Sequence, residues 1–200
     1  MTTMLDMGPQ AREVAALLEG VRDDGLDAPT PCTSWTVGGL LDHLLGLTVA
    51  FRDAADKNLG ETTGVPPADS ASSLPDDWRD RLPRQLVDLA AAWRNEAAWE
   101  GETQVGGVDL PGAAAGGFAV NELVLHGWDL ARATGQPYTG DPAGVHASAA
   151  LLAQFADAEQ RARIFGPAAE VPAGAGPLER AVALSGRDPG WTPAANGGAG

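Results

Sequence analysis

The chain has 200 residues, of which 13 are basic and 27 are acidic, so its formal net charge is −14. This acidity argues against nucleic-acid binding, because a polyanion repels such a protein and no basic cluster offsets the charge locally. No apolar run reaches the roughly 18 residues of a membrane span, and a single cysteine without a signal-like N-terminus indicates a reducing, cytoplasmic setting.

Two helices are predicted near the N-terminus. Apolar residues recur at helical spacing over residues 9–21, and the Asp-Asp-Gly stretch at 23–25 ends this pattern. Residues 29–35 contain two prolines and predict a loop. Thr36 is the expected N-cap of the second helix, which runs to about Lys57.

A loop and a third helix follow. Residues 59–73 are rich in Gly, Pro, Ser and Thr, which predicts the loop. Pro75 and the two aspartates after it open the helix, because proline suits the first turn and acidic side chains suit the positive end of the helix dipole. The apolar face runs to Trp93, and Pro83 either kinks the helix or marks its true start. In the Gly-rich residues 101–111 we expect at most a short extended piece and no sheet.

The second half of the chain predicts one long helix and two shorter ones. Residues 112–134 form the long helix, with Gly135 as its C-cap. The Asp-Pro pair at 141–142 supplies an N-cap and a first-turn proline for a helix that continues to about Arg163. Residues 177–185 predict a short last helix.

These elements predict one all-α domain over residues 1–191, a four-helix bundle with extra short helices and loops. Residues 192–200 are expected to form a disordered tail. Bundles bind ligands and metals with side chains from facing helices. The search for chemistry therefore starts from side chains on the apolar helix faces.

His126 has the most informative setting of the three histidines. Glu122 lies four residues before it and therefore shares its helix face, and Asp129 lies three residues after it. A carboxylate on a face of small apolar residues is costly unless something pairs with it. A metal ion would do so, and so would the histidine alone; from this motif by itself, the plain Glu–His pair is the more common case.

The other two histidines are less distinctive. His43 lies on the second helix between Gly39 and Gly46, and glycines inside a helix cost about 1 kcal/mol each. They indicate the close approach of a helix or a ligand, although a buried, hydrogen-bonded histidine is the more common explanation. His146 follows the start of the fifth helix among small residues, and we interpret it as a surface or bundle-end residue without a role.

Taken together, His43, Glu122 and His126 predict a metal site. Two neutral imidazoles and one carboxylate are the ligand set of catalytic zinc sites, which leave one position open for water or substrate. Asp129 would either accept a hydrogen bond that orients His126 behind the metal or face elsewhere.

Three further residues have two readings each. Cys32 is either a nucleophile, with a thiol pKa lowered by the helix start that follows it, or, more commonly, a small buried loop residue. Trp35 and Trp128 lie close in sequence to the candidate ligands and would line a pocket, although such residues more often belong to the core.

Several segments resemble a known family. Residues 29–37 and 40–44, and the run Glu122–Gly135, are similar to the two motifs of the metal-binding domain of mycothiol-dependent maleylpyruvate isomerases, within the DinB-like superfamily. The Phe165–Pro167 turn and the Leu184–Pro189 segment also resemble actinobacterial members. The likeness covers nearly the whole chain.

The resemblance implies a DinB-like four-helix bundle with a divalent metal, zinc in first place and nickel as an alternative, held by His43, Glu122 and His126. It implies that a low-molecular-weight thiol, mycothiol in actinobacteria, is deprotonated at the metal and attacks a small electrophilic substrate. The isomerase proper carries an additional C-terminal domain for which this sequence has no room, so we do not expect maleylpyruvate isomerisation itself. Since DinB-like bundles often dimerise, a homodimer is left open.

Three interpretations follow. In the preferred one the chain is a metal- and thiol-dependent transferase or isomerase, with no general base identified and with Arg132 as the nearest cation for an anionic substrate. In the second it is a non-catalytic metal- or small-molecule-binding bundle for stress or sensing, which a fourth protein ligand would favour; His146 is the residue to test. In the third it is a structural interaction module, with His43 far from Glu122 and His126.

Overall fold

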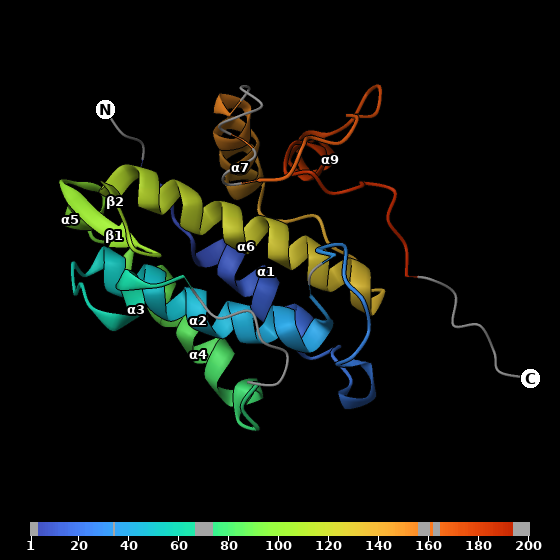
Figure 1. Cartoon of the computed structure of the whole chain (residues 1–200), viewed down its shortest axis with the longest axis horizontal. Helices are drawn as coiled ribbons and strands as arrows, with labels where there is room; N and C mark the ends of the chain where they lie inside the picture. Colours follow the sequence, from blue (N-terminus) through green and yellow to red (C-terminus); the bar gives the residue numbers. More distant parts are fainter. Residues whose placement is uncertain (1–3, 34, 67–73, 156–160, 162–164, 194–200) are drawn as a thin grey trace, which may run out of the picture.

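The computed structural model describes residues 4–33, 35–66, 74–155, 161 and 165–193 (Figure 1). Its helices are α1 (Gly8–Leu18), α2 (Val37–Ala55), α3 (Glu61–Gly64), α4 (Trp78–Ala92), α5 (Glu96–Trp99), α6 (Gly112–Thr134), α7 (Pro142–Gln154) and α9 (Pro177–Leu184), with a 3-10 turn at Asp23–Gly25 and two strands, β1 (Glu102–Val105) and β2 (Val108–Pro111). Among these helices, none has both the length and the apolar character needed to cross a bilayer.

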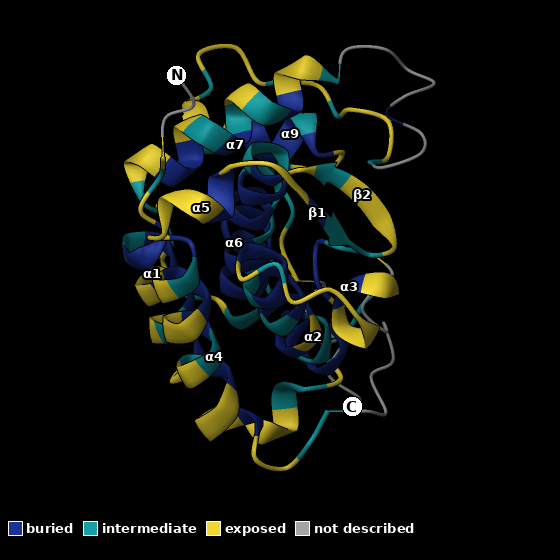
Figure 2. Cartoon of the chain, turned by 90° about the vertical axis from the view of Figure 1, so that its left-hand side faces the viewer, coloured by how far each residue is buried: buried dark blue, intermediate teal, exposed yellow. Residues whose placement is uncertain are grey.

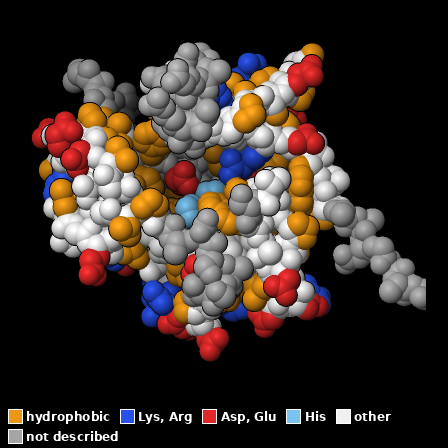
Figure 3. Space-filling view, viewed as in Figure 1, with side chains coloured by type: hydrophobic (Ala, Val, Ile, Leu, Met, Phe, Trp, Pro, Cys, Tyr) orange, Lys and Arg blue, Asp and Glu red, His pale blue; other side chains and the backbone are white. Residues whose placement is uncertain are grey.

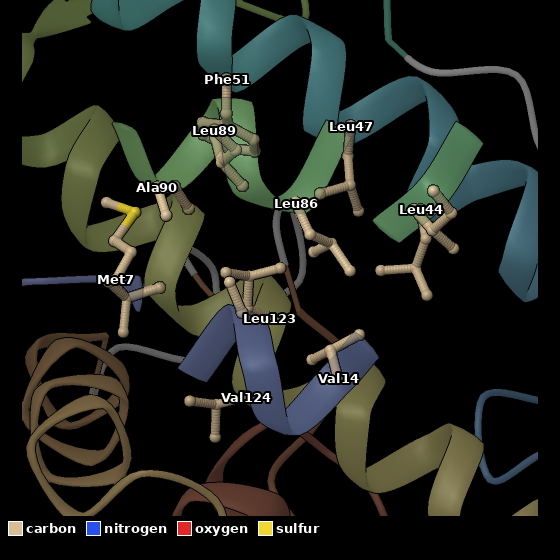
Figure 4. Packing of buried hydrophobic residues seen from close by; sticks show 14 of the residues in the cluster. Met7, Val14, Leu44, Leu47, Phe51, Leu86, Leu89, Ala90, Leu123 and Val124 are labelled. Atoms are coloured by element: carbon tan, nitrogen blue, oxygen red, sulfur yellow. The ribbon is translucent and has the colours of Figure 1, made fainter. Parts of the chain in front are cut away.

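Helices α1, α2, α4 and α6 form the predicted four-helix bundle. Both α1 and α2 pack against α4 and α6, so that the apolar faces of all four helices meet in one core. In Figure 4, Val14, Leu44, Leu86 and Leu123 represent the four helices in this core, and each is at most 1% exposed. Full burial of one such side chain stabilises the fold by about 1.5–3 kcal/mol. The prediction of an all-α bundle is confirmed.

The two helices that carry the candidate ligands begin or end at their predicted caps. The backbone N–H of Gly39 donates to Oγ1 of Thr36 at 3.2 Å, which caps α2. Gly135 has a left-handed conformation with φ 68° at the end of α6. A residue with a Cβ would be strained there by roughly 1–2 kcal/mol, so glycine ends the helix at this position.

Two predicted helix boundaries in the N-terminal half of the chain are wrong. Helix α1 ends at Leu18 rather than near Val21, because Gly20 and Val21 donate to carbonyls only three residues back and the last turn unwinds. Val21 is buried all the same, so its place in the apolar pattern reflects burial. Helix α4 begins at Trp78, after a turn closed by the carbonyl of Pro75, and Pro83 lies inside it.

The predicted fifth helix is also too long. Helix α7 ends at Gln154, since Phe155 leaves the helical conformation with ψ 59°. Residues 156–160, 162 and 163 of the predicted helix lie outside the described residues, as do residues 67–73 of the predicted loop and residues 194–200 of the predicted tail.

The expectation of no sheet is wrong. Strands β1 and β2 pair antiparallel, with Val105 opposite Val108 across a turn of Gly106 and Gly107. Both glycines have positive φ, 59° and 78°, as a type I′ turn requires. The hairpin joins the bundle where Oγ1 of Thr103 donates to the carbonyl of Ala54 in α2. A Gly-Gly pair between two valines is a local hairpin signal that the sequence reasoning missed.

Helices α7 and α9 lie on the side of α6 away from α2 and α4 (Figure 1). Leu125 and Trp128 of α6, Leu152 of α7 and Val182 of α9 belong to a second apolar cluster between these helices. Figure 2 accordingly shows α6 in the middle of the molecule and buried along most of its length. Trp128 is therefore a core residue.

Candidate metal centre

The three predicted ligands meet in the structure. Donor atoms of His43, Glu122 and His126 all lie within 4.8 Å of one another. His43 comes from α2 and the other two from α6, and these helices pack against each other in the bundle. The structural-module interpretation required His43 to lie far from Glu122 and His126, and that requirement is not met.

One carboxylate oxygen joins the two imidazoles. Oε2 of Glu122 lies 2.9 Å from Nε2 of His126 and 3.5 Å from Nε2 of His43. The two rings meet edge to face, with centroids 4.9 Å apart and an interplanar angle of 78°. His126 is almost fully buried, whereas about a quarter of the Glu122 side chain is exposed. The cluster therefore has a buried end at His126 and an accessible end at Glu122.

A buried ion pair lies behind His126. Nδ1 of His126 is 3.0 Å from Oδ2 of Asp129. The guanidinium of Arg187 donates through Nε to Oδ1 and through Nη2 to Oδ2 of Asp129, each at 2.7 Å. Such a two-pronged contact fixes the plane of the carboxylate. Asp129 therefore faces His126 rather than elsewhere. A proton on Nδ1, donated to Oδ2 of Asp129, would leave Nε2 as the nitrogen suited to a metal.

Neighbouring charges hold the pKa values of Glu122 and His126 away from their usual range. Burial alone would raise the pKa of Glu122, but His126 and His43 outweigh it and hold that pKa well below its usual value. Burial alone would lower the pKa of His126, but Glu122 and Asp129 outweigh it and raise that pKa. The site thus favours a positive charge between the carboxylates, either a proton on His126 or a divalent cation in its place.

The cluster opens into a cavity of about 510 Å³. Figure 3 shows this face of the molecule, with histidine side chains at the bottom of a hollow and an acidic side chain beside them. The lining residues other than the three donors are Pro31, Cys32, Thr33, Trp35, Phe118, Leu125, Phe165, Gly166, Ser185, Gly186 and Arg187. The Trp35 ring lies 4.3 Å from His43 and 5.3 Å from His126 between centroids, so Trp35 is a pocket residue.

His146 and Arg132 do not join the site. Nδ1 of His146 donates to the carbonyl of Pro142 at 2.7 Å, and this exposed ring lines a different cavity. Nη2 of Arg132 donates to the carbonyl of Trp191 at 2.6 Å, away from the cluster. Within the described residues the cation of the site is Arg187, which the sequence reasoning missed. Arg187 lies in the Leu184–Pro189 segment that resembles the family. No local pattern indicates its contact with Asp129, which is 58 residues away in sequence.

Comparisons with known proteins give the family and the fold. The sequence model of the mycothiol maleylpyruvate isomerase N-terminal domain matches residues 7–131, which include the three donors and Asp129 but not Arg187. The uncharacterized proteins MT0763 and Rv0738 of Mycobacterium tuberculosis are each 32% identical over 139 residues, which is 64% of this chain and 65% of each relative. The chain thus spans somewhat less than two thirds of the length of these relatives.

Two solved structures are similar to this fold. The crystal structure of the mycothiol-dependent maleylpyruvate isomerase matches with a TM-score of 0.56 and 21% identity, over 72% of this chain and 65% of that one. A mutant of that isomerase matches over the same shares with a TM-score of 0.54 and 20% identity. The likeness shows that this chain shares the helical fold of that isomerase over the matched residues.

Proposed function

The chain belongs to the mycothiol maleylpyruvate isomerase N-terminal domain family, and from this premise we propose that His43, Glu122 and His126 hold a divalent metal ion at which a small thiol reacts with an electrophile. The observation that carries the proposal is the meeting of two Nε2 atoms at one carboxylate beside an open cavity. Zinc is the first candidate metal, with nickel as the alternative. Mycothiol is the first candidate thiol, because it appears in the names of the family and of the solved relative.

The donor set fits a catalytic metal. Zinc ligands lie about 2.0–2.2 Å from the ion, so two donors of one ion are at most about 4.4 Å apart. The present separations, within 4.8 Å, require only small side-chain movements. A purely metal-binding role would be favoured by a fourth protein ligand, and His146 does not supply one. Three protein donors beside a cavity favour the catalytic interpretation.

When bound, a divalent cation lowers the pKa of a thiol and so provides a thiolate at neutral pH. The chain supplies the surroundings. Trp35, Phe118 and Phe165 give the cavity an aromatic wall against which an apolar portion of a substrate can pack. Asp129 keeps the Nδ1 proton on His126, which holds the ring in one tautomer.

The cavity also indicates the kind of electrophile. Arg187 is the only Lys or Arg among the described lining residues, and its guanidinium is already bound to Asp129 and to Oγ of Ser185. Among the described lining residues, no further cation is available to bind a substrate with several carboxylates. We therefore infer an electrophile that binds through an uncharged, apolar portion. A transferase would release the thiol adduct, whereas an isomerase would expel the thiol again after rearrangement.

Metal content is the first test. Plasma mass spectrometry of the untagged protein should find about one divalent ion per chain in the wild type and almost none in His126→Ala. No metal in either protein, even after incubation with zinc or nickel, would refute the site. Cobalt-loaded protein should then develop thiol-to-cobalt absorption when mycothiol is added, and it should consume an uncharged electrophile only when the thiol is present. Metal binding without either response would favour the non-catalytic alternative.

A further inference from the structure

Arg187 links the segment after α9 to the candidate metal centre. It lies outside residues 7–131, which match the family, yet it contacts Asp129 on α6 across 58 residues of sequence. We propose that Arg187 is a positioning residue: it holds Asp129 in the orientation that makes His126 present Nε2 to the metal. Metal affinity then depends on the docking of this segment. The inference rests on the metal centre proposed above.

The end of α9 is built to present this side chain. Gly186 has φ 89°, and a Cβ there would come within 2.9 Å of the carbonyl oxygen of Pro167. The chain therefore turns sharply at a position where only glycine fits. The N–H of Arg187 donates to the carbonyl of Val182, and its Nη1 donates to Oγ of Ser185. The backbone and the side chain of Arg187 are thus each held by a contact other than those to Asp129.

The guanidinium of Arg187 fixes the orientation of the Asp129 carboxylate. Asp129 is completely buried, and both of its oxygens accept from Arg187. Without the guanidinium this carboxylate would lose the two contacts that fix its plane and would turn away, because an unpaired buried charge is costly. That turn removes the acceptor for Nδ1–H of His126. Lysine would keep the charge, but a single ammonium cannot fix the plane of a carboxylate as a guanidinium does.

Docking and metal binding are coupled in both directions if Arg187 acts in this way. A segment whose docking strengthens metal binding must itself be held more firmly when the metal is bound. A residue that only tethers the segment would give no such effect. Arg132 is the matched control, since its Nη2 donates to the carbonyls of Trp191 at 2.6 Å and Pro189 at 3.4 Å without touching Asp129.

The experiment is a cobalt titration of metal-free protein, followed by visible absorption, for the wild type and for Arg187→Met, Arg187→Lys and Arg132→Met. Arg187→Met should weaken cobalt affinity about 10- to 100-fold and change the cobalt spectrum, as expected for loss of a group that orients a ligand. Arg187→Lys should fall between it and the wild type. Arg132→Met loosens the same segment at Pro189 and Trp191 without touching Asp129, so it should weaken cobalt affinity far less than Arg187→Met and keep the wild-type spectrum. Circular dichroism shows which variants are folded.

Wild-type affinity in Arg187→Met or Arg187→Lys, or equal weakening in Arg132→Met, would overturn the positioning role while leaving the metal centre in place. A wild type that takes up no cobalt would overturn the metal centre as well. If Arg187→Met does not fold, limited proteolysis of the wild type tests whether metal binding and docking of the segment after α9 are coupled. Cobalt should slow cleavage after α9, and equal cleavage rates with and without cobalt would overturn the coupling.

Discussion

Nε2 of His43 lies 3.5 Å from Oε2 of Glu122, although 79 residues separate the two in sequence. The contact crosses from α2 to α6 inside the bundle. The candidate metal centre is therefore part of a helix–helix interface. Its donor geometry depends on how these two helices pack, and its chemistry can be tested one donor at a time.

Replacing Glu122 by glutamine should abolish metal binding while keeping the shape of the side chain. The amide carries no charge and is a poorer ligand for zinc than a carboxylate. We expect the metal content to fall from about one ion per chain to almost none, measured by plasma mass spectrometry. Glu19→Gln, at an exposed position after α1, is the matched control and should keep its metal. A fully loaded Glu122→Gln protein would remove Glu122 from the ligand set.

Zinc binding should release protons and weaken in acid. Burial alone would lower the pKa of His126, but Glu122 and Asp129 raise it. Below the raised pKa, zinc must displace a proton from the ring, so affinity rises as the pH rises through that value. Calorimetry in two buffers of different protonation enthalpy measures the protons released. A heat that does not depend on the buffer at neutral pH would contradict this prediction.

The raised pKa of His126 should also make the folding stability of the metal-free protein depend on pH. Because the pKa of His126 is raised in the fold, its contribution to stability is fully present below the ordinary histidine value and is lost as the pH rises through the raised value. Metal-free protein should thus lose stability over that window, whereas zinc-loaded protein should not. Urea unfolding over a pH series, with and without zinc, checks the difference; parallel curves would count against it.

Gly127→Ala should destabilise the protein by about 1–3 kcal/mol through overpacking. A Cβ there would lie 2.6 Å from the hydroxyl oxygen of Tyr138, which cannot easily move because Gln10 donates to it and it donates to the carbonyl of Val124. Gly117→Ala on the same helix is the control. Among the described residues its Cβ would meet only Leu151 at 3.9 Å, so it should stabilise α6 by roughly 0.5–1 kcal/mol. Urea unfolding of the two variants should give opposite signs, and equal signs would contradict the packing argument.

Phe118→Ala should impair the reaction of an apolar electrophile without changing the metal content. Phe118 belongs to the aromatic wall of the cavity and is not a metal donor. Loss of one aromatic contact costs on the order of 1 kcal/mol, or about fivefold in kcat/KM. Comparing an uncharged electrophile with a dicarboxylate in the wild type and the variant tests the inferred substrate class. A wild type that prefers the dicarboxylate would refute that class.

The amino-acid sequence by itself determined the local features of this protein. The bounds of α6 are predictable because Gly135 ends the helix, and Thr36 marks the start of α2 for an equally local reason. Glu122 and His126 share a face simply because a helix has 3.6 residues per turn. The Gly-Gly hairpin is also encoded locally, although the glycine content of residues 101–111 alone predicts at most a short extended piece.

Only the tertiary structure decided which distant groups meet. The resemblance named His43 beside Glu122, but their contact depends on how α2 packs against α6. Arg187 reaches Asp129 only because the chain reverses at Gly186 after α9 has docked on α7. Spacing along one helix carries information over a few residues, since it follows from backbone geometry. Contacts across 58 and 79 residues follow instead from the burial of whole helix faces, which no short pattern records.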